Sequence, residues 1–263
     1  MIPRSLLFVP GNRPERFAKA AESGADLVCI DLEDAVAPGD KRGAREATVA
    51  YLRGAPAHVG VRVNGPGTQE IGDDLAALAG LELPFVMVPK VDTVAQLEGV
   101  TTDAPLIPVI ESGLAVLNAR EIMAHPKTRM ALFGGGDYAA DLGTPMTWEA
   151  FLYARGHLAA CSAAFEVPVF DVPWLDVHDV EGGEADTRRV ADLGLHSRAA
   201  IHPKQIAAIH AAYTPSEDDV AQARSLRDTY AAADGNAALH EGKLVEAPML
   251  RAAERVLARA GIL

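Results

Sequence analysis

The sequence predicts an α/β fold, the (β/α)8 or TIM barrel, followed by a C-terminal helical appendage. Eight short apolar segments recur along the chain, and helix-forming stretches separate most of them. Parallel strands that are buried on both faces read as continuous Val, Ile and Leu runs, and they need crossover helices between them. The length of 263 residues is typical of one such barrel with modest room to spare. The predicted strands are 5–9, 27–30, 59–63, 85–88, 106–110, 130–133, 167–170 and 199–201.

Helix signals follow most of these strands. Asn12 stands where it can cap the first helix, with Glu15 three residues later as in a capping box, and this helix ends near Gly24. Three glycines at 134–136 separate the sixth strand from its helix. The remaining predicted helices of the barrel are 40–53, 75–83, 93–98, 148–165 and 186–194.

The pattern changes after Tyr213, where eight strands are already complete. Thr214, Pro215, Ser216 and Glu217 form a strong start signal for a helix over 214–233. A loop then precedes a last helix over 249–260. We therefore expect a barrel domain over 1–213 and a helical extension over 214–263 that packs on the barrel or on a neighbouring subunit.

Composition excludes several classes of partner. The net charge of −12 argues against a nucleic-acid surface, because phosphate binding needs a basic face. The sequence lacks an apolar run of 18 residues, and its start lacks the layout of a signal peptide, so we expect a cytoplasmic protein without a membrane partner. Cys29 and Cys161 are too few for a disulfide framework or a zinc cage.

Two acidic residues follow neighbouring predicted strands and are the leading candidates for a functional site. Glu111 comes after the fifth strand and Asp137 after the sixth. The carboxyl ends of barrel strands form the active-site face, and two carboxylates with open positions suit Mg²⁺. Glycines 134–136 allow the backbone to approach a ligand closely. The alternative interpretation is that both acids are simply helix N-caps.

Arg62 is the second candidate, because it lies within a strand otherwise made of Val and Gly. A guanidinium there needs acidic partners or an anionic substrate. It can form a structural ion pair with Glu33 or Asp34, grip a substrate carboxylate, or do both. Glu33 and Asp34 follow the second strand and can accept hydrogen bonds from Arg62 or from metal-bound water; for Asp34 a solvated loop position is equally open. Lys90 can neutralise an anion or pair with the same acids.

Histidines and known catalytic motifs carry weaker signals. His202, at the end of the eighth strand, can cap or shape a loop, with catalysis as the less favoured interpretation. His157 and His210 lie on predicted helices, where packing or surface roles are favoured. The sequence contains no HExxH, CxxC, Walker A or GxSxG motif, which disfavours zinc proteases, redox enzymes, P-loop proteins and serine hydrolases.

The chain resembles the family of citrate lyase β subunits and their stand-alone relatives, within the acyl-CoA lyases and class II aldolases. The matching stretches are RSLLFVPGNRPERFAKA, DLVCIDLEDAVAP, VRVNGPGT, VPKVDT, VIESG, LFGGGDYAADLG and AIHPKQI, in family order over nearly the whole chain. The resemblance implies a homotrimeric TIM barrel that binds Mg²⁺. It also implies cleavage of a β-hydroxyacyl thioester, such as citryl-CoA, citramalyl-CoA or malyl-CoA, to an acyl thioester and an oxo acid such as oxaloacetate.

Residue roles follow from the same resemblance. Glu111 and Asp137 match the metal ligands, Glu111 also borders the substrate, and Arg62 matches the substrate-carboxylate binder. The acids of DLEDA, Glu33 and Asp34, match residues that support these groups. Many relatives carry a tail motif GKMVDxP whose Asp reaches a neighbouring subunit's site for acid–base catalysis. This chain reads GKLVEAP, so Glu246 occupies that position with one more methylene.

Other functions stay open on the sequence alone. The altered tail motif is compatible with a non-catalytic or partner-dependent citrate-lyase-like subunit that needs an acyl-carrier protein. A thioesterase acting on related thioesters, or a pyruvate aldolase of the same superfamily acting on free oxo acids, is a further alternative. Binding of CoA would separate the last of these from the lyase.

Overall fold

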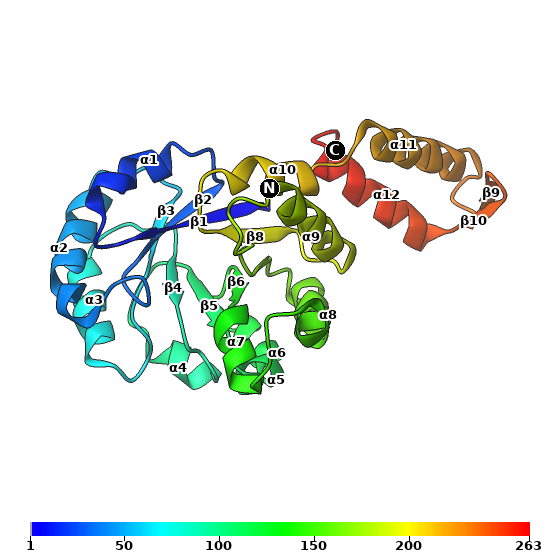
Figure 1. Ribbon diagram of the computed structural model, residues 1–263. Coiled ribbons are helices and arrows are strands. Elements are labelled where there is room, and N and C mark those ends of the chain that lie inside the picture. The colour runs from blue at the N-terminus through cyan, green and yellow to red at the C-terminus, as the bar shows by residue number, and fades with distance from the viewer. Residues whose placement is uncertain (1) are drawn as a thin grey trace. The chain divides into compact units, whose positions relative to one another are not determined.

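The computed structural model describes residues 2–263 and divides them into two compact units, 2–210 and 211–263. The first unit contains a closed barrel of eight parallel strands in sequence order, with β8 paired to β1. Figure 1 shows helices around the outside of these strands. The predicted TIM barrel is therefore confirmed. Its strands are β1 Ser5–Pro10, β2 Leu27–Asp31, β3 Val59–Arg62, β4 Val86–Val88, β5 Leu106–Ile110, β6 Ala131–Phe133, β7 Val169–Asp171 and β8 Ser197–Ala200.

Strand bounds differ from the predicted ones by one or two residues. β7 begins at Val169 rather than at residue 167. Pro168 has no N–H for the ladder, although its carbonyl still accepts a hydrogen bond from Ala131. β8 begins at Ser197, two residues before the predicted start. The prediction missed Ser197 and Arg198 because it relied on apolar residues. Arg198 in this strand is nevertheless fully buried.

The helices that follow the barrel strands range from 5 to 18 residues in length. Their bounds are α1 Phe17–Ala21, α2 Lys41–Leu52, α3 Gln69–Leu78, α4 Val94–Glu98, α5 Gly113–Leu117, α6 Ala119–Met123, α7 Gly135–Leu142, α8 Trp148–Phe165, α9 Val180–Asp192 and α10 Gln205–Tyr213, with 3-10 turns at Pro14–Arg16 and Pro38–Asp40.

Three helix starts differ from the predicted ones. Asn12 does not cap the first helix, because a 3-10 turn intervenes and Asn12 instead donates to Asp40. α3 begins six residues before the predicted start, where the Thr68 hydroxyl accepts from the N–H of Ile71. α9 begins six residues early, where Asp179 caps it. Thr68 and Asp179 are ordinary N-cap residues. The predicted starts relied on apolar periodicity alone and therefore missed them.

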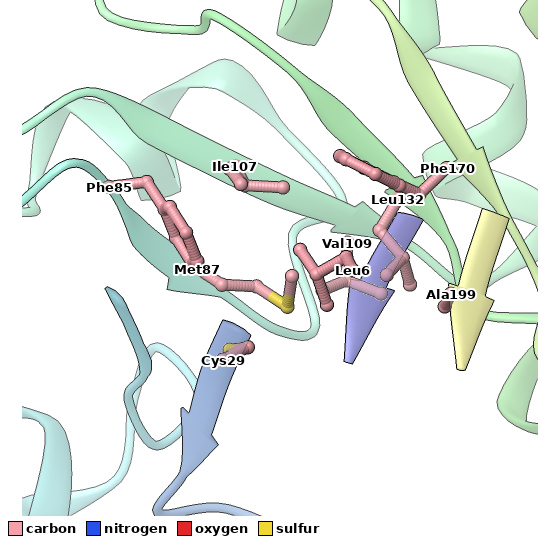
Figure 2. Close-up of a cluster of buried hydrophobic side chains, with 9 residues drawn as sticks. All are labelled: Leu6, Cys29, Phe85, Met87, Ile107, Val109, Leu132, Phe170 and Ala199. Atoms are coloured by element: carbon pink, nitrogen blue, oxygen red, sulfur yellow. The ribbon is translucent and has the colours of Figure 1, made fainter. Parts of the chain in front are cut away.

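The barrel interior is closed by side chains from seven of its strands (Figure 2). Its core cluster consists of Leu6, Cys29, Phe85, Met87, Ile107, Val109, Leu132, Phe170 and Ala199. All are nearly inaccessible to solvent, as expected for a packed barrel rather than a pore. Gly60 in β3 makes room for one of them, because a Cβ there would lie 2.7 Å from the Phe85 ring. Because apolar side chains fill the barrel interior, catalytic groups can lie only at the ends of the strands.

A buried ion-pair network supports β7 and β8. Arg155 of α8 makes a bidentate pair with Asp171, at 3.0 and 2.9 Å. Arg198 of β8 contacts Asp186 of α9 at 2.7 Å and also donates to the Val172 carbonyl. Two buried guanidiniums thus alternate with two carboxylates, which keeps every charge paired. The network ties α8 and α9 to the strands they cover.

The second unit is a helical hairpin with a small sheet at its turn. α11 Glu217–Ala232 and α12 Ala247–Arg259 pack through Ala223, Ala253 and Leu257. Between them, β9 Ala238–His240 and β10 Lys243–Val245 form an antiparallel pair where a loop was predicted. Glu241 and Gly242 both have positive φ, the signature of a two-residue hairpin turn. Across residues 2–263, no helix combines the length and apolar character that crossing a bilayer requires.

Candidate active site

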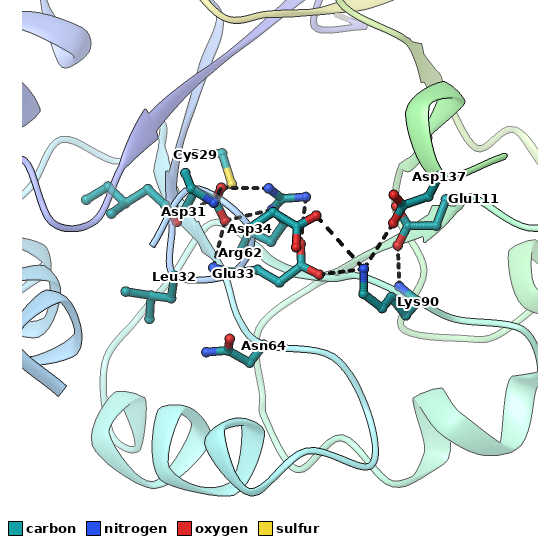
Figure 3. A network of polar contacts seen from close by, with 12 residues as sticks. Cys29, Asp31, Leu32, Glu33, Asp34, Arg62, Asn64, Lys90, Glu111 and Asp137 are labelled. Carbon is teal, nitrogen blue, oxygen red and sulfur yellow. Dashed lines mark hydrogen bonds and ion pairs between the residues drawn. The ribbon is translucent and has the colours of Figure 1, made fainter. Parts of the chain in front are cut away.

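Acidic side chains that end or follow β2, β5 and β6 meet at the carboxyl end of the barrel. We call this cluster the acidic mouth; it consists of Asp31, Glu33, Asp34, Glu111 and Asp137 (Figure 3). The first three end or follow β2, Glu111 follows β5, and Asp137 lies in the first turn of α7 after β6. Arg62, at the end of β3, and Lys90, after β4, lie between them. A cavity of about 540 Å³ opens here, lined by Arg62, Glu111 and Asp137 among others.

Arg62 is fixed by two of these acids. Its Nε and Nη2 donate to the two oxygens of Asp31 at 2.7 and 2.6 Å, and Nη1 lies 2.9 Å from Glu33. The guanidinium also lies over the Phe8 ring at 5.0 Å. Burial opposes its charge, but Asp31 and Glu33 outweigh burial and raise the pKa of Arg62. Two of its five N–H donors thus bond to Asp31, and Arg62 is among the residues that line the cavity.

Lys90 joins the two sides of the acidic mouth. Its Nζ lies 3.1 Å from Glu33 and 3.0 Å from Asp137, as Figure 3 shows. Burial lowers the pKa of Lys90, but the contacts with Asp137 and Glu33 prevail and raise it. Burial also raises the pKa of Glu33, against the opposing effect of Arg62. Of the two open interpretations of Lys90, pairing with these acids is the one the structure shows.

Glu111 is a buried carboxyl group with few compensating donors. Its side chain accepts the backbone N–H of Lys90 at 2.5 Å. Burial raises the pKa of Glu111 to about 7; the Lys90 N–H opposes this shift, whereas Glu33 and Asp137 add to it. A carboxyl group held in this way gains from a cation that favours its charged form.

The donor set at Glu111 and Asp137 fits a hard divalent cation. A Cβ at Gly134 would lie 2.5 Å from Glu111 Cβ and 2.6 Å from its Oε2, so only glycine leaves room for this carboxylate. Among residues 2–263, no three of His, Cys, Asp and Glu are grouped to bind one metal. Two carboxylates with the remaining positions open match Mg²⁺, which keeps several water ligands or takes substrate oxygens. Zinc cages of nitrogen and sulfur donors do not match this set.

Neighbouring loops are held by hydrogen bonds that sequence reasoning missed. Asp74 in α3 is fully buried; it accepts from the backbone and side chain of Asn64, and Arg45 contacts it at 2.6 Å. After β5, the Ser112 hydroxyl donates to Asp92 at 2.5 Å. These bonds fix the loops after β3, β4 and β5. The sequence gave no signal of these bonds, because the partners are 10 to 29 residues apart in the chain.

The cavity is also lined by exposed apolar side chains. Met146, Leu175 and Ile201 line it with side chains that are 39%, 60% and 43% exposed. His202, next to Ile201, accepts from the Lys204 N–H, and so shapes this loop as its first interpretation had it. Glu246 belongs to the other compact unit and lies exposed between β10 and α12. Its predicted role at the site stays a prediction.

Comparison with known proteins adds to this geometry. Residues 4–203 match the HpcH/HpaI aldolase/citrate lyase family. The chain is 38% identical to a citrate lyase subunit beta-like protein of Deinococcus radiodurans, over 97% of this chain and 96% of that protein. The chain belongs to the HpcH/HpaI aldolase/citrate lyase family. This confirms the resemblance drawn from the motifs.

Other members of the family are similar over the whole length. An L-malyl-CoA/beta-methylmalyl-CoA lyase of Cereibacter sphaeroides is 32% identical, over 98% of this chain and 94% of that protein. The crystal structure of CitE from Mycobacterium tuberculosis in complex with magnesium, acetoacetate and coenzyme A superposes with a TM-score of 0.87, at 36% identity and 98% coverage of both chains. Another structure of that citrate lyase beta subunit, with oxaloacetate and magnesium, has a TM-score of 0.74 at 35% identity, covering 81% of this chain and 97% of that one.

The raised pKa of Glu111 predicts a pH dependence of stability in EDTA. In the folded chain Glu111 keeps its proton up to about pH 7, whereas its ordinary pKa is 4.5. Its contribution is therefore complete below about pH 4.5 and is lost as the pH rises through 7, by up to about 3 kcal/mol. Urea unfolding of wild type and Glu111→Gln between pH 4.5 and 8 measures this difference. A difference that stays constant across the range contradicts the assignment.

Proposed function

We propose that this protein is a Mg²⁺-dependent carbon–carbon lyase that cleaves a β-hydroxyacyl-CoA thioester to an acyl thioester and an oxo acid. One observation carries the proposal: Glu111, Asp137 and Arg62 line a single cavity at the carboxyl end of the barrel. Membership of a family that includes a malyl-CoA lyase and citrate lyase subunits supports the same reaction class. The thioester is of the citryl-CoA, citramalyl-CoA or malyl-CoA type.

Glu111 and Asp137 would hold the metal ion, as their oxygen donors and the room beside Gly134 allow. When bound, Mg²⁺ would supply Lewis acidity to the substrate's hydroxyl oxygen, which becomes the keto oxygen of the product. Solved relatives contain magnesium together with oxaloacetate or with acetoacetate and coenzyme A. Glu33 and Asp34 lie beside these groups and would support them: Glu33 orients Arg62, and Asp34 faces Lys90 at 3.9 Å.

Arg62 would bind the carboxylate of the substrate through N–H donors that Asp31 does not engage. Asp31 and Glu33 hold the guanidinium in place. Arg62 is therefore already oriented when the substrate binds, and the substrate adjusts to it. A base removes the proton of the substrate hydroxyl, and the carbon–carbon bond then breaks. The electron pair of that bond remains on the thioester fragment as an enolate, which a protonated side chain converts to the acyl thioester. Arg62 offsets negative charge near the breaking bond.

The acyl chain and the thioester have apolar side chains to contact in the cavity. Met146, Leu175 and Ile201 add exposed apolar surface to a lining that also contains Arg62 and the carboxylates. A free oxo acid would use only the polar part of a cavity of about 540 Å³. The size and the mixed lining of the cavity therefore favour a thioester over a simple oxo acid.

The lyase proposal predicts that the purified chain with Mg²⁺ converts at least one of citryl-CoA, citramalyl-CoA or malyl-CoA to acetyl-CoA and oxaloacetate, pyruvate or glyoxylate. Glu111→Gln and Asp137→Asn should each lower turnover about 100-fold or more, because a lost metal ligand removes several kcal/mol of transition-state stabilisation. Glu98→Gln, at the exposed end of α4, is the matched control and should keep full activity. Failure on every thioester at saturating Mg²⁺ would overturn the lyase, and release of free CoA would favour a thioesterase.

Glu246 would act as the acid–base group from the C-terminal unit, which we propose packs on a barrel, its own or a neighbour's. We expect Glu246→Ala to lower kcat about 10²- to 10⁴-fold while Mg²⁺ binding is retained. Glu254→Ala, exposed in α12, is the control and should leave kcat unchanged. Steady-state kinetics with magnesium titrations would separate these effects. Equal kcat in wild type and Glu246→Ala contradicts the role.

A partner-dependent subunit is the second candidate, favoured by Glu246 in place of the family's Asp. In that case the lone chain is inactive on free CoA thioesters. Activity then appears with a thioester carried by an acyl-carrier protein, or after Glu246→Asp. Robust turnover of free CoA thioesters by the lone chain excludes this candidate.

We also propose that the protein is a homotrimer. Neighbouring helices α5, α7 and α8 expose an unusual number of large apolar side chains. They are Leu114, Leu117, Leu142, Leu152 and Tyr153, with exposed fractions between 45% and 64%. Exposed apolar patches of this kind mark protein interfaces, and a second copy of the chain is the occupant that a homotrimer supplies.

The homotrimer proposal predicts a light-scattering mass of three chains for wild type. Leu117→Glu should shift the mass to one chain, because a charge in the patch must be desolvated on association. Val180→Glu, at the exposed start of α9 in the barrel unit and outside the patch, is the control and should stay trimeric. A monomeric wild type, or a trimeric Leu117→Glu, contradicts the proposed interface.

A further inference from the structure

Lys90 touches both proposed metal ligands, by two different parts of the residue. Its backbone N–H donates to Glu111 Oε1 at 2.5 Å, and its Nζ lies 3.0 Å from Asp137 Oδ2. On the other side, Nζ lies 3.1 Å from Glu33. An ammonium thus occupies the space between acids where a cation is favoured. Figure 3 shows it between the acids after β2 and those after β5 and β6.

The backbone of Lys90 is fixed, whereas its side chain is free to move. The residue has a φ of 55°, a conformation that a non-glycine residue adopts at a cost and that persists where its surroundings hold it. The bond to Glu111 and a bond from Gln96 to the Lys90 carbonyl provide that hold. The side chain is 49% exposed and carries four methylenes, so Nζ can leave the acids without moving the backbone.

Arg62 differs from Lys90 in this respect. Its side chain is 14% exposed, with two N–H groups bonded to Asp31 and a third nitrogen 2.9 Å from Glu33. Displacement of Arg62 would remove the guanidinium from two buried carboxylates, whereas displacement of Nζ uncovers the half-exposed Asp137 and leaves Glu33 still paired with Arg62. The acidic mouth therefore has one permanent cation and one that can be exchanged.

We propose that Lys90 is an internal counter-ion that occupies Asp137 in the metal-free protein and yields it to the divalent cation. The proposal rests on the metal site of the proposed function. Release of Nζ is then a required part of metal binding, and the ammonium sets the affinity for Mg²⁺. The Lys90 backbone N–H keeps Glu111 oriented in both states, because it does not move with the side chain.

Calorimetric titration of the full chain with Mg²⁺ alone tests the competition. Lys90→Met keeps the length of the side chain and removes the charge, so Mg²⁺ should bind about three- to tenfold more tightly than to wild type. Lys204→Met is the matched control: Lys204 also follows a barrel strand, is exposed, and forms no ion pair among residues 2–263. It removes an equal charge at the same end of the barrel and should change the affinity much less.

The outcomes separate this inference from the proposed function. Equal or weaker Mg²⁺ binding by Lys90→Met, with wild type binding normally, overturns the counter-ion role and leaves the metal site intact. Absence of Mg²⁺ binding in wild type overturns the metal site and the counter-ion role together. Tighter binding by Lys204→Met to the same extent would also overturn the inference, because a general charge effect would then explain it.

A second measurement uses the wild-type protein and does not depend on the folding of a variant. Brief acetylation of lysines with acetic anhydride, read by mass spectrometry, reports the accessibility of each Nζ. Addition of Mg²⁺ should increase the acetylation of Lys90 several-fold relative to Lys204, because Nζ has left Asp137 and Glu33. Unchanged or reduced acetylation of Lys90 when Mg²⁺ is bound would overturn the proposal.

Discussion

The concentration of negative charge at one end of the barrel is the constraint on which the rest of the site depends. Five carboxyl groups converge there, and the three buried ones, Asp31, Glu33 and Glu111, must each be paired, protonated or bound to a cation. Asp31 is paired with Arg62, Glu33 with Arg62 and Lys90, and Asp137 with Lys90. Glu111 lacks such a cation, and burial raises its pKa to about 7. A further positive charge would therefore be most favourable beside Glu111 and the neighbouring Asp137.

Rigid supports surround this charge cluster. Gly134 gives the Glu111 carboxylate its room, Asp74 holds the loop after β3 through Asn64, and Asp92 joins the loops after β4 and β5 through Ser112. None of these residues needs to touch a substrate. They reduce the freedom of the groups that would, and ordered groups stabilise a transition state without reorganisation.

The sequence predicted the barrel and the convergence of Glu111 and Asp137, because strand ends of a parallel barrel share one face whatever their exact bounds. It offered Glu33 or Asp34 as an ion-pair partner of Arg62, and the structure shows Glu33. It assigned no role to Asp31, which makes the bidentate contact. That choice depends on register, since Asp31 lies directly beside Arg62 in the β2–β3 pairing. The role of Lys90 depends on contacts with residues 21 and 47 positions away in the chain. The role of Asp74 depends on its burial in the folded protein. Neither can be read from the amino-acid composition.

Register also explains why the two cations of the site are of different kinds. Arg62 lies within a paired strand beside Asp31, where a planar fork matches a carboxylate and lasting burial is tolerated. Lys90 lies two residues beyond the end of β4, where a flexible stem can reach acids on both sides and also release them. An arginine at position 90 would hold Asp137 in a fork and oppose exchange, and a lysine at position 62 would lack the planar fork that donates to both oxygens of Asp31 at once. The site needs one guanidinium that stays and one ammonium that leaves, and the strand ends place each where its chemistry suits it.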